Sequence, residues 1–400
     1  AQENVRGADK VVISSAIPDE NVELQYARKN EIPVLARAEM LVELMEGRQG
    51  IAISGTHGKT TTTSMISHIA VEAGLDPTVL IGGELETIGG NVRTGEGKYF
   101  ITEADESDGS LLNFRPRIGV VTNLEMEHLD YYDSHEKLLE TFAHFLDRIP
   151  PNGRAILWAE DEALASLMKE KEDDDCYLTF GINKGNIRAE DIELLPFGSY
   201  FVLKYGDRQL GQINLNVPGK HNILNALATS AVALYIGLDF TTIKESLLTF
   251  SGPGRRFEKK ALVDGVLIVD DYAHHPTEIK ATLKAARNTG YERIIAVFQP
   301  HRYSRTKHLF EEFSYAFSDA DYLILTSIYS ADEKEIPGVR AEDMVPLLEK
   351  NSGVEVKYIA DIPAVIDHLQ KIVTSRDLVI TIGAGDIYKA AEELGSRLRG

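Results

Sequence analysis

The sequence predicts an α/β protein whose domains are built on parallel sheets, and three observations lead to this fold class. Strand-length apolar runs alternate with helix-length segments along the 400 residues, which is the pattern of doubly wound sheets. At residues 51–63 a strand, a glycine turn, a Lys-Thr pair and a helix-length segment follow one another, the order found in a phosphate-binding loop. In the last third of the chain, polar clusters stand directly after strands, where ligands bind in open α/β sheets.

Size and composition fit a globular protein of two or three domains. A net charge of −20 argues against non-specific binding of nucleic acid, because that requires a basic surface. The single cysteine, Cys176, excludes an internal disulfide framework and fits a reducing cytosol. No apolar run reaches the ~18 residues of a membrane span, and no signal peptide is visible. We therefore expect a cytoplasmic protein with neither a nucleic-acid nor a membrane partner.

The first 49 residues alternate strands and helices but are too few to form a doubly wound domain. The apolar pattern predicts strands at Val11–Ser15 and Val34–Leu35, and helices at about Asn21–Asn30 and Arg37–Met45. The chain also opens in a polar segment without an initiator methionine. We interpret residues 1–49 as the last part of a domain.

Residues 50–250 form the second predicted domain, which begins with the strand and helix around the glycine turn. Further elements are expected as strands at Tyr99–Thr102 and Ile118–Thr122, helices at about His135–Arg148, Asp161–Lys169 and Ile223–Ile236, and a linker at Gly252–Gly254. Short alternating segments between Tyr177 and Leu215, separated by glycine-rich turns, predict antiparallel strands.

Residues 251–400 repeat strand and helix and predict a second doubly wound domain. Its strands are expected at Leu267–Asp270, Ile294–Phe298, Tyr322–Thr326, Val354–Tyr358 and Leu378–Ile382. Polar clusters follow the first, second and last of these strands, so we expect the clusters to meet at one edge of the sheet.

The glycine turn predicts a nucleoside-triphosphate site. Backbone N–H groups and a helix N-terminus suit phosphate, Lys59 can reach the outer phosphates, and the hydroxyl of Thr60 is placed to ligate Mg²⁺. Only two residues separate Gly55 from Gly58, whereas the usual pattern has four before its Gly-Lys pair. The alternative is an ordinary glycine turn before a helix. That helix has one apolar face, which includes Met65 and Ile69.

An acidic cluster at residues 103–108 is a candidate metal site, because Mg²⁺ bound with ATP takes one or two carboxylates. Glu103 is nearest the preceding strand, and the alternative is a solvated acidic loop. His128 follows the next strand and is either a surface histidine or a metal ligand; as a ligand it favours Mn²⁺ as an alternative to Mg²⁺.

Asn222 and Asn225 lie three residues apart, so both fall on one helix face. An amide offers both a donor and an acceptor, as adenine recognition requires. N-capping of the helix is the alternative interpretation, which suits Asn222 better than Asn225.

The third domain opens with Arg255 and Arg256, and an arginine brought across from another domain can neutralise charge in phosphoryl transfer. Asp271, His274 and His275 crowd a strand end, with Pro276 in the first helical position. The spacing does not make a convincing zinc site, so a substrate contact is the favoured interpretation and a structural role the alternative.

His301, Arg302 and Arg305 follow the next strand and predict a pocket for a carboxylate or phosphate. Lys307 extends the set. The alternative interpretation is that these cationic side chains form salt bridges with Glu311 and Glu312 on the following helix.

Taken together, these segments resemble the Mur ligases, the ATP-dependent amide-forming enzymes of peptidoglycan precursor synthesis. The resemblance covers nearly the whole chain and rests on residues 11–17, 55–63, 103–108, 221–226, 255–258, 270–278, 299–306 and 383–387. The short phosphate loop is a mark of this family. The resemblance implies three domains: a partial N-terminal Rossmann-like domain, a central P-loop domain that binds ATP, and a C-terminal Rossmann-like domain.

Within the family, the chain is most similar to the member that joins L-alanine to the carboxylate of UDP-N-acetylmuramic acid through an acyl phosphate. The alternative is the recycling ligase that adds a murein tripeptide to the same nucleotide sugar. A kinase and a non-enzymatic nucleotide-binding module are rivals from other classes. We expect ATP and Mg²⁺ as cofactors and a monomer or a weak homodimer.

The resemblance also implies roles for individual residues. ATP contacts are implied for Gly55, Thr56, His57, Gly58, Lys59, Thr60, Thr61, Asn222, Asn225, Arg256 and Asp271, and metal ligation for Thr60, Glu103 and His128. Catalytic or acceptor contacts are implied for Lys59, His274, His301, Arg302 and Arg305, and substrate contacts for Ser14, Ser15 and Tyr272. The base that accepts the amine proton is left open between His274 and His301. One departure is that these ligases begin with a glycine-rich loop for the UDP group, which is not present in this chain.

Overall fold

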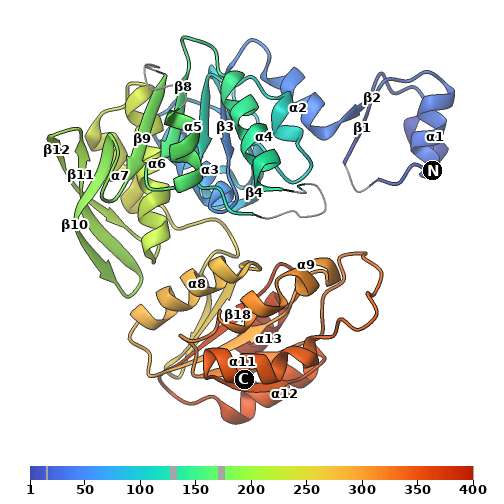
Figure 1. The fold of residues 1–400 in the computed structure, drawn as a ribbon, viewed down its shortest axis with the longest axis vertical. Helices are drawn as coiled ribbons and strands as arrows, with labels where there is room; N and C mark the ends of the chain where they lie inside the picture. The colour runs from blue at the N-terminus through green and yellow to red at the C-terminus, as the bar shows by residue number, and fades with distance from the viewer. Residues whose placement is uncertain (15–16, 127–131, 133, 170–175, 400) are drawn as a thin grey trace.

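The computed structural model describes residues 1–400 except 15–16, 127–131, 133, 170–175 and 400. The strands form three sheets, which correspond to three parts of the chain (Figure 1). No helix among the described residues combines the length and apolar character that a membrane span requires. We keep the domain names of the sequence analysis for the three parts.

The N-terminal part is a small parallel pair of strands with two helices. Its elements are β1 (Val11–Ile13), α1 (Val22–Lys29), β2 (Val34–Ala36) and α2 (Arg37–Met45). The Asn21 side chain caps α1 by accepting from the backbone N–H groups of Glu23 and Leu24. Leu41 and Met45 of α2 pack into the core of the central domain, so this helix attaches the N-terminal part to the central sheet.

The central domain is a ten-stranded sheet with the strand order β12-β11-β10-β9-β8-β7-β3-β6-β4-β5. Its strands are β3 (Gln49–Ser54), β4 (Thr78–Leu85), β5 (Gly90–Arg93), β6 (Tyr99–Glu103), β7 (Ile118–Val121), β8 (Arg154–Trp158), β9 (Tyr177–Gly181), β10 (Ile187–Leu195), β11 (Gly198–Tyr205) and β12 (Arg208–Leu215). Its helices are α3 (Lys59–Glu72), α4 (His135–Asp147), α5 (Glu162–Lys169), α6 (Lys220–Tyr235) and α7 (Phe240–Thr249).

Two features of this sheet differ from the sequence-based expectation. Strand β9 pairs in parallel with both β8 and β10, so the antiparallel pairs between Tyr177 and Leu215 are β10–β11 and β11–β12, and the prediction for Tyr177–Gly181 was wrong. The pattern of a strand alone does not reveal the direction of its partner. Strands β4, β5 and β8 were not predicted; in β4, Gly82 and Gly83 interrupt the apolar run.

Helix α3 is more deeply buried than its single apolar face suggested. Every residue from Thr61 to Ala70 is buried, including five Thr and Ser side chains and His68. The helix packs against the sheet beside helices α6 and α7, and its core is shared with them. Figure 1 shows all three helices in the central domain. His68 is accommodated because its ring nitrogens contact Thr87 Oγ1 and the carbonyl of Ser246.

The C-terminal domain is a six-stranded sheet with the strand order β13-β14-β18-β15-β16-β17. Its strands are β13 (Glu258–Val263), β14 (Val266–Asp271), β15 (Arg293–Phe298), β16 (Tyr322–Leu325), β17 (Glu355–Tyr358) and β18 (Asp377–Ile382), all parallel except the edge strand β13. Its helices are α8 (Pro276–Asn288), α9 (Tyr303–His308), α10 (Phe310–Ser314), α11 (Val345–Ser352), α12 (Ile362–Ile372) and α13 (Tyr388–Arg399). Separate apolar cores on its two faces make it the predicted doubly wound sheet.

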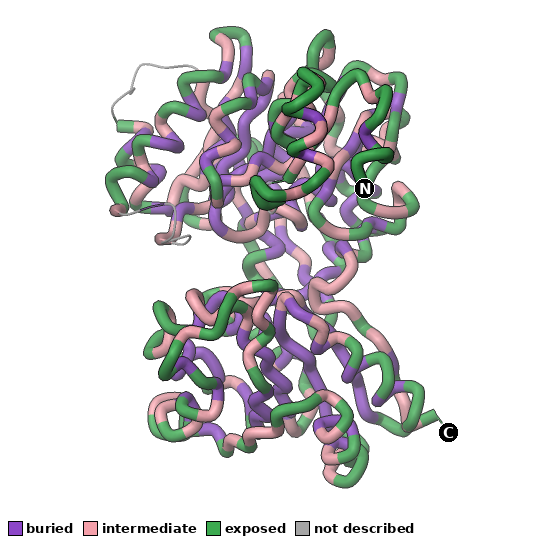
Figure 2. Tube along the Cα trace, turned by 90° about the vertical axis from the view of Figure 1, so that its right-hand side faces the viewer, coloured by how far each residue is buried: buried purple, intermediate pink, exposed green. Residues whose placement is uncertain are grey.

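The central and C-terminal domains form two lobes that meet at a waist (Figure 2). The chain crosses this waist at residues 251–254, where the backbone N–H of Gly254 donates to the carbonyl of Glu84. Side chains at the carboxyl ends of strands from both sheets approach each other there, and the candidate site lies between them.

Candidate active site

The loop between β3 and α3 has the geometry of an anion cradle. Gly55 and Gly58 have φ angles of +119° and +84°, which favour glycine. The loop is fixed against the segment after β7, because the N–H of His57 donates to Asn123 Oδ1 and the Thr122 hydroxyl donates to the carbonyl of His57. Gly58 directly precedes α3, so the helix N-terminus faces the position where a phosphate would lie.

Lys59 lies in the cradle and contacts a buried carboxylate that sequence reasoning did not single out. Its Nζ donates to the carbonyl oxygens of Gly55 and Thr56 at 2.6 and 3.1 Å, and lies 2.7 Å from Glu106 Oε1. The Glu106 side chain is 2% exposed. Lys59 is therefore held inside the loop at the N-terminal end of α3, where the outer phosphates of a nucleotide would bind.

Thr60 and Glu103 form a pair suited to Mg²⁺. The Thr60 hydroxyl lies 3.2 Å from Glu103 Oε2, and the other carboxylate oxygen accepts from the N–H of Gly82 at 2.7 Å. Burial raises the pKa of Glu103, against the opposing effects of Gly82 and Lys59. A hydroxyl and a carboxylate beside a phosphate cradle are the oxygen ligands that Mg²⁺ takes, so these residues fit the ion. His128, the third predicted ligand, lies outside the described residues.

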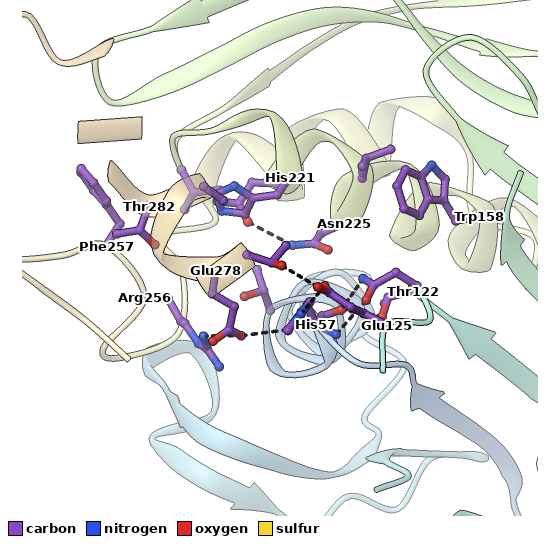
Figure 3. Close-up of a pocket in the computed structure, with 18 of the residues that line it drawn as sticks. His57, Thr122, Glu125, Trp158, His221, Asn225, Arg256, Phe257, Glu278 and Thr282 are labelled. Atoms are coloured by element: carbon purple, nitrogen blue, oxygen red, sulfur yellow. Dashed lines mark hydrogen bonds and ion pairs between the residues drawn. The ribbon is translucent and has the colours of Figure 1, made fainter. Parts of the chain in front are cut away.

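A cavity of about 390 Å³ lies between the cradle and the C-terminal domain, and Figure 3 shows side chains that line it. Asn222 and Asn225 line it from α6, together with the apolar side chains of Trp158, Phe180 and Val217. The cavity continues to Arg256 and Asp271 of the C-terminal domain. An apolar slot with a few convergent polar groups is typical of a site for a planar ligand.

Asn222 does not cap its helix, contrary to the alternative interpretation. The N-cap residue of α6 is Gly219, and the Asn222 amide donates to the carbonyl of Pro218. The Asn225 amide donates to Asn222 Oδ1, and the Thr62 hydroxyl donates to Asn225 Oδ1. This hydrogen-bonded chain fixes the orientation of both amides along the cavity wall.

A second, more polar cavity of about 700 Å³ is lined from both sides of the domain contact. The central domain contributes Lys59, Thr60 and Glu103, and the C-terminal domain contributes Arg256, Tyr272, His274 and Glu278. The residues that the sequence assigned to ATP and metal thus face those assigned to the acceptor.

Glu278 is the main residue that sequence reasoning missed. Its carboxylate lies 3.4 Å from His57 Nδ1, 3.5 Å from His274 Nδ1 and 3.7 Å from Arg256 Nη1. Burial alone would raise the pKa of Glu278, but the charges of His274, His57 and Arg256 hold it well below its usual range. The sequence signal was its position in the first turn after Pro276, where a carboxylate can reach back to the residues before the helix, and the backbone N–H of His274 donates to it.

Asp271 ends β14 at the edge of the first cavity. Its carboxylate accepts from the backbone N–H groups of Phe257 and Ala273. Burial raises the pKa of Asp271 to about 6, although Arg256 and these hydrogen bonds act to lower it. The group can therefore change charge near neutral pH when a ligand alters its surroundings.

Arg255 and Arg256 have different surroundings despite their adjacency. Arg255 Nε donates to the fully buried Asp270, and its two amino groups donate to the carbonyls of Gly383 and Gly385. Arg255 therefore joins β14 to the segment after β18. Arg256 lies in both cavities.

His301 and Arg305 lie next to each other beyond His274. Arg305 Nη1 is 3.4 Å from His301 Nδ1, and the imidazole stacks on Tyr329 with ring centroids 5.5 Å apart. Burial, with the nearby charges of His274 and Arg305, lowers the pKa of His301 to about 3. Arg302 is more peripheral, and its guanidinium lies 4.0 Å from Glu333.

Ser14, a predicted contact for the UDP group, is not among the residues that line the two cavities. Ser14 follows β1 in the N-terminal part and is exposed. Ser15 lies outside the described residues. The structure therefore brings Lys59, Thr60 and Glu103 together with Arg256, Tyr272 and His274, but it leaves Ser14 and Arg302 outside the cavities.

Comparison with known families gives matches along most of the chain. The Mur ligase middle domain matches residues 53–233, the glutamate ligase domain of Mur ligases matches residues 255–385, and the catalytic domain of the Mur ligase family matches residues 1–49. The two longer matches cover the predicted central and C-terminal domains.

Individual relatives agree with these matches. UDP-N-acetylmuramate–L-alanine ligase of Geotalea daltonii is 49% identical over 400 residues, covering 99% of this chain and 86% of that protein. The same ligase of Geobacter sulfurreducens is 45% identical, with 99% and 86% covered. The crystal structure of the UDP-N-acetylmuramate–alanine ligase of Thermotoga maritima has a TM-score of 0.84 at 27% identity, covering 100% of this chain and 87% of that one.

Proposed function

Because the chain belongs to the Mur ligase family, we propose that it joins L-alanine to the carboxylate of UDP-N-acetylmuramate at the expense of ATP, through an acyl phosphate. Relatives that are 45–49% identical over nearly the whole chain are UDP-N-acetylmuramate–L-alanine ligases. The observation that carries the residue-level proposal is the cavity lined by Lys59 and Glu103 on one side and by Arg256 and His274 on the other. Donor and acceptor groups for a phosphoryl transfer thus line one cavity.

In the first step, the muramoyl carboxylate attacks the γ-phosphorus of ATP, the bond to the bridging oxygen breaks, and ADP leaves. The acyl group now carries phosphate, which is a good leaving group. A free carboxylate would instead have to lose a hydroxide-like oxygen, which leaves poorly. Lys59 neutralises charge on the transferred group from the cradle, and Arg256 does so from the opposite domain. Thr60 and Glu103 would hold Mg²⁺, which supplies further neutralisation of phosphate charge.

In the second step, the amine of L-alanine attacks the acyl carbon, the tetrahedral intermediate loses phosphate, and the amine loses a proton. His274 suits the role of base better than His301, because His274 lines the cavity that Lys59 and Glu103 also line. With its pKa lowered to about 3, His301 is neutral but only weakly basic, whereas a base works best with a pKa near the operating pH. His274 Nδ1 lies 3.0 Å from the carbonyl of Tyr272, so Nδ1 carries the hydrogen and Nε2 is the basic atom.

His301 and Arg305 then serve recognition rather than proton transfer. A neutral imidazole beside a guanidinium suits a carboxylate, which L-alanine and the muramoyl group both carry. Asn222 and Asn225 would meet adenine in the apolar cavity, and Asp271 the ribose.

The test is formation of the amide product from ATP, UDP-N-acetylmuramate and L-alanine, with release of ADP and phosphate. Release is expected only when the sugar nucleotide and the amino acid are both present. Strong ADP release in the absence of both contradicts the ligase proposal. A parallel assay replaces L-alanine with the murein tripeptide, and a preference for the tripeptide contradicts the choice of acceptor.

The same assay uses a chimaera that supplies the remaining residues of the Geotalea daltonii relative, because the chain covers 86% of that protein. If the chimaera makes product and the 400-residue chain does not, sugar-nucleotide binding is the missing step. If neither makes product, the proposal is contradicted.

A further inference from the structure

We propose that His57, Glu125 and His275 bind one divalent transition-metal ion of the Zn²⁺ class at the contact between the central and C-terminal domains. One ligand atom from each of these residues lies within 4.8 Å of the other two. Two imidazoles and a carboxylate are a donor set that suits zinc, with water as the fourth ligand. This site is separate from the Thr60 and Glu103 pair, whose oxygen atoms suit Mg²⁺.

The three residues come from segments far apart in the sequence. His57 lies in the loop between β3 and α3, Glu125 follows β7, and His275 is the N-cap residue of α8. His57 and Glu125 point toward each other at the inner end of the cavity (Figure 3). The site therefore exists only while the two domains are in contact.

The ligand atoms are held in place by neighbouring groups. His57 Nε2 lies 3.0 Å from Glu125 Oε2, while His57 Nδ1 lies 3.4 Å from Glu278 Oε1. A carboxylate on the outer nitrogen of a ligating histidine is the usual partner in zinc sites, because it fixes the tautomer and increases the basicity of the inner nitrogen. Thr277 supports Glu125 in the same way, with its hydroxyl donating to Oε1 at 2.7 Å.

His275 completes the site from the C-terminal domain. Its Nδ1 accepts from the backbone N–H of Thr277, so we assign Nε2 as the ligand atom. The residue is 3% exposed, and its ring centroid lies 4.9 Å from that of His57. Ligand atoms at 2.0–2.1 Å from a tetrahedral ion are about 3.3 Å apart, so side-chain rotations alone can close the site around zinc.

An ion bound here would connect the phosphate loop directly to helix α8. Its ligands from both domains would resist separation of the lobes, since opening removes His275 from the site. We expect Zn²⁺ to favour the arrangement in which the domains are in contact, independently of any nucleotide.

The test measures binding of Zn²⁺ alone to the 400-residue chain by equilibrium dialysis, with Co²⁺ as a spectroscopic probe. We expect one Zn²⁺ per chain and visible absorption bands from four-coordinate Co²⁺. His275→Asn removes the imidazole but keeps a residue that caps helices well, and should weaken Zn²⁺ binding more than 100-fold. Glu278→Gln removes the outer carboxylate and should weaken it roughly 10–100-fold.

Two variants serve as controls. His308→Asn removes an exposed histidine at the end of α9, and Glu103→Gln alters the pair assigned to Mg²⁺; both should leave Zn²⁺ affinity unchanged. Circular dichroism checks that each variant is folded, and Glu278→Gln provides a second measurement if His275→Asn does not fold. Failure to bind one equivalent of Zn²⁺, or binding that neither His275→Asn nor Glu278→Gln weakens, overturns the proposal without affecting the ligase assignment.

Discussion

The central and C-terminal domains are both α/β sheets that direct strand ends into one cleft, but they contribute to it differently. The central domain supplies a backbone cradle, in a glycine loop fixed by Thr122 and Asn123, and places its side chains around that loop. The C-terminal domain supplies side chains from separate strand ends, including Asp271, His274 and His301. A backbone site depends on conformations that only certain residues permit, whereas a side-chain site depends on how separate strand ends are brought together.

This difference predicts different consequences of mutation in the two domains. In the central domain, a change in the loop should alter both stability and activity, because the same backbone packs against the segment after β7 and forms the phosphate cradle. In the C-terminal domain, adjacent residues can separate the two effects, as Arg255 and Arg256 illustrate.

The largest effect is expected for Lys59→Ala. Loss of the cation that faces the transferred phosphoryl group should lower turnover by about 10²–10³-fold, measured as ADP release with both substrates present. The variant also leaves Glu106 without its nearest cation, and breaking a buried ion pair costs about 3–5 kcal/mol of unfolding free energy.

A double variant separates these two effects. Lys59→Ala combined with Glu106→Gln removes the buried charge, so it should regain most of the stability in urea unfolding while turnover stays low. If turnover recovers along with stability, Lys59 has no direct role in the chemistry.

Arg255→Ala should have the next largest effect, and chiefly on stability. It removes the partner of Asp270, which has no exposed surface, and three hydrogen bonds that join two strand ends. We expect a loss of about 3–5 kcal/mol in the free energy of unfolding, measured with urea.

The neighbouring variant Arg256→Ala provides the matched comparison. Its guanidinium lies in the cavities rather than in the sheet, so stability should fall by about 1 kcal/mol and turnover by about 10²-fold. A reversal of this pattern, with Arg256→Ala the more destabilising change, would contradict the assignment of separate roles.

The same contrast explains which features were predictable from the sequence. The glycine loop, Lys59 and Thr60 were found because a backbone cradle requires glycines at fixed positions. Strands β14 and β15 were found because fully buried parallel strands are continuous apolar runs, whereas the edge strand β13, which is only partly buried, was not predicted.

The remaining features depend on pairing between distant segments, which no local pattern records. Strand β4 was missed because its glycines make room beside Glu103 and Thr60. The contacts of Glu106 and Glu125 depend on the sheet order, which places β6 and β7 on either side of β3. The role of Glu278 depends on the contact between domains, since its partner His57 belongs to the other lobe.

Gly55→Ala should have an intermediate effect on the backbone site. The new Cβ would clash with Thr122 Oγ1 and lie 2.8 Å from the Thr122 nitrogen, at a φ of +119°. We expect a loss of about 2–4 kcal/mol in the free energy of unfolding, with weaker ATP binding measured by calorimetry. Gly74→Ala is the control, because Gly74 also has a positive φ but no atom within 4 Å of the added Cβ. It should cost only about 1–2 kcal/mol and leave ATP binding unchanged; equal losses in both variants would remove the special role of the loop.

The smallest effect is expected from the protonation of Asp271, which lies in the part of the site that the C-terminal domain supplies. Burial raises its pKa to about 6 in the ligand-free protein. A ribose hydroxyl that donates to this carboxylate favours the charged form, so binding should release a proton near pH 6 and become tighter as the pH rises. If only the charged form binds, a pKa of about 6 gives about tenfold higher affinity at pH 7 than at pH 5.

Adenosine is the ligand of choice for this measurement, because phosphate groups themselves titrate near pH 6. Calorimetry in buffers with different ionisation enthalpies measures the released proton directly. In Asp271→Asn, the pH dependence should disappear between pH 5 and 7, whereas an unchanged pH dependence would assign the titration to another group.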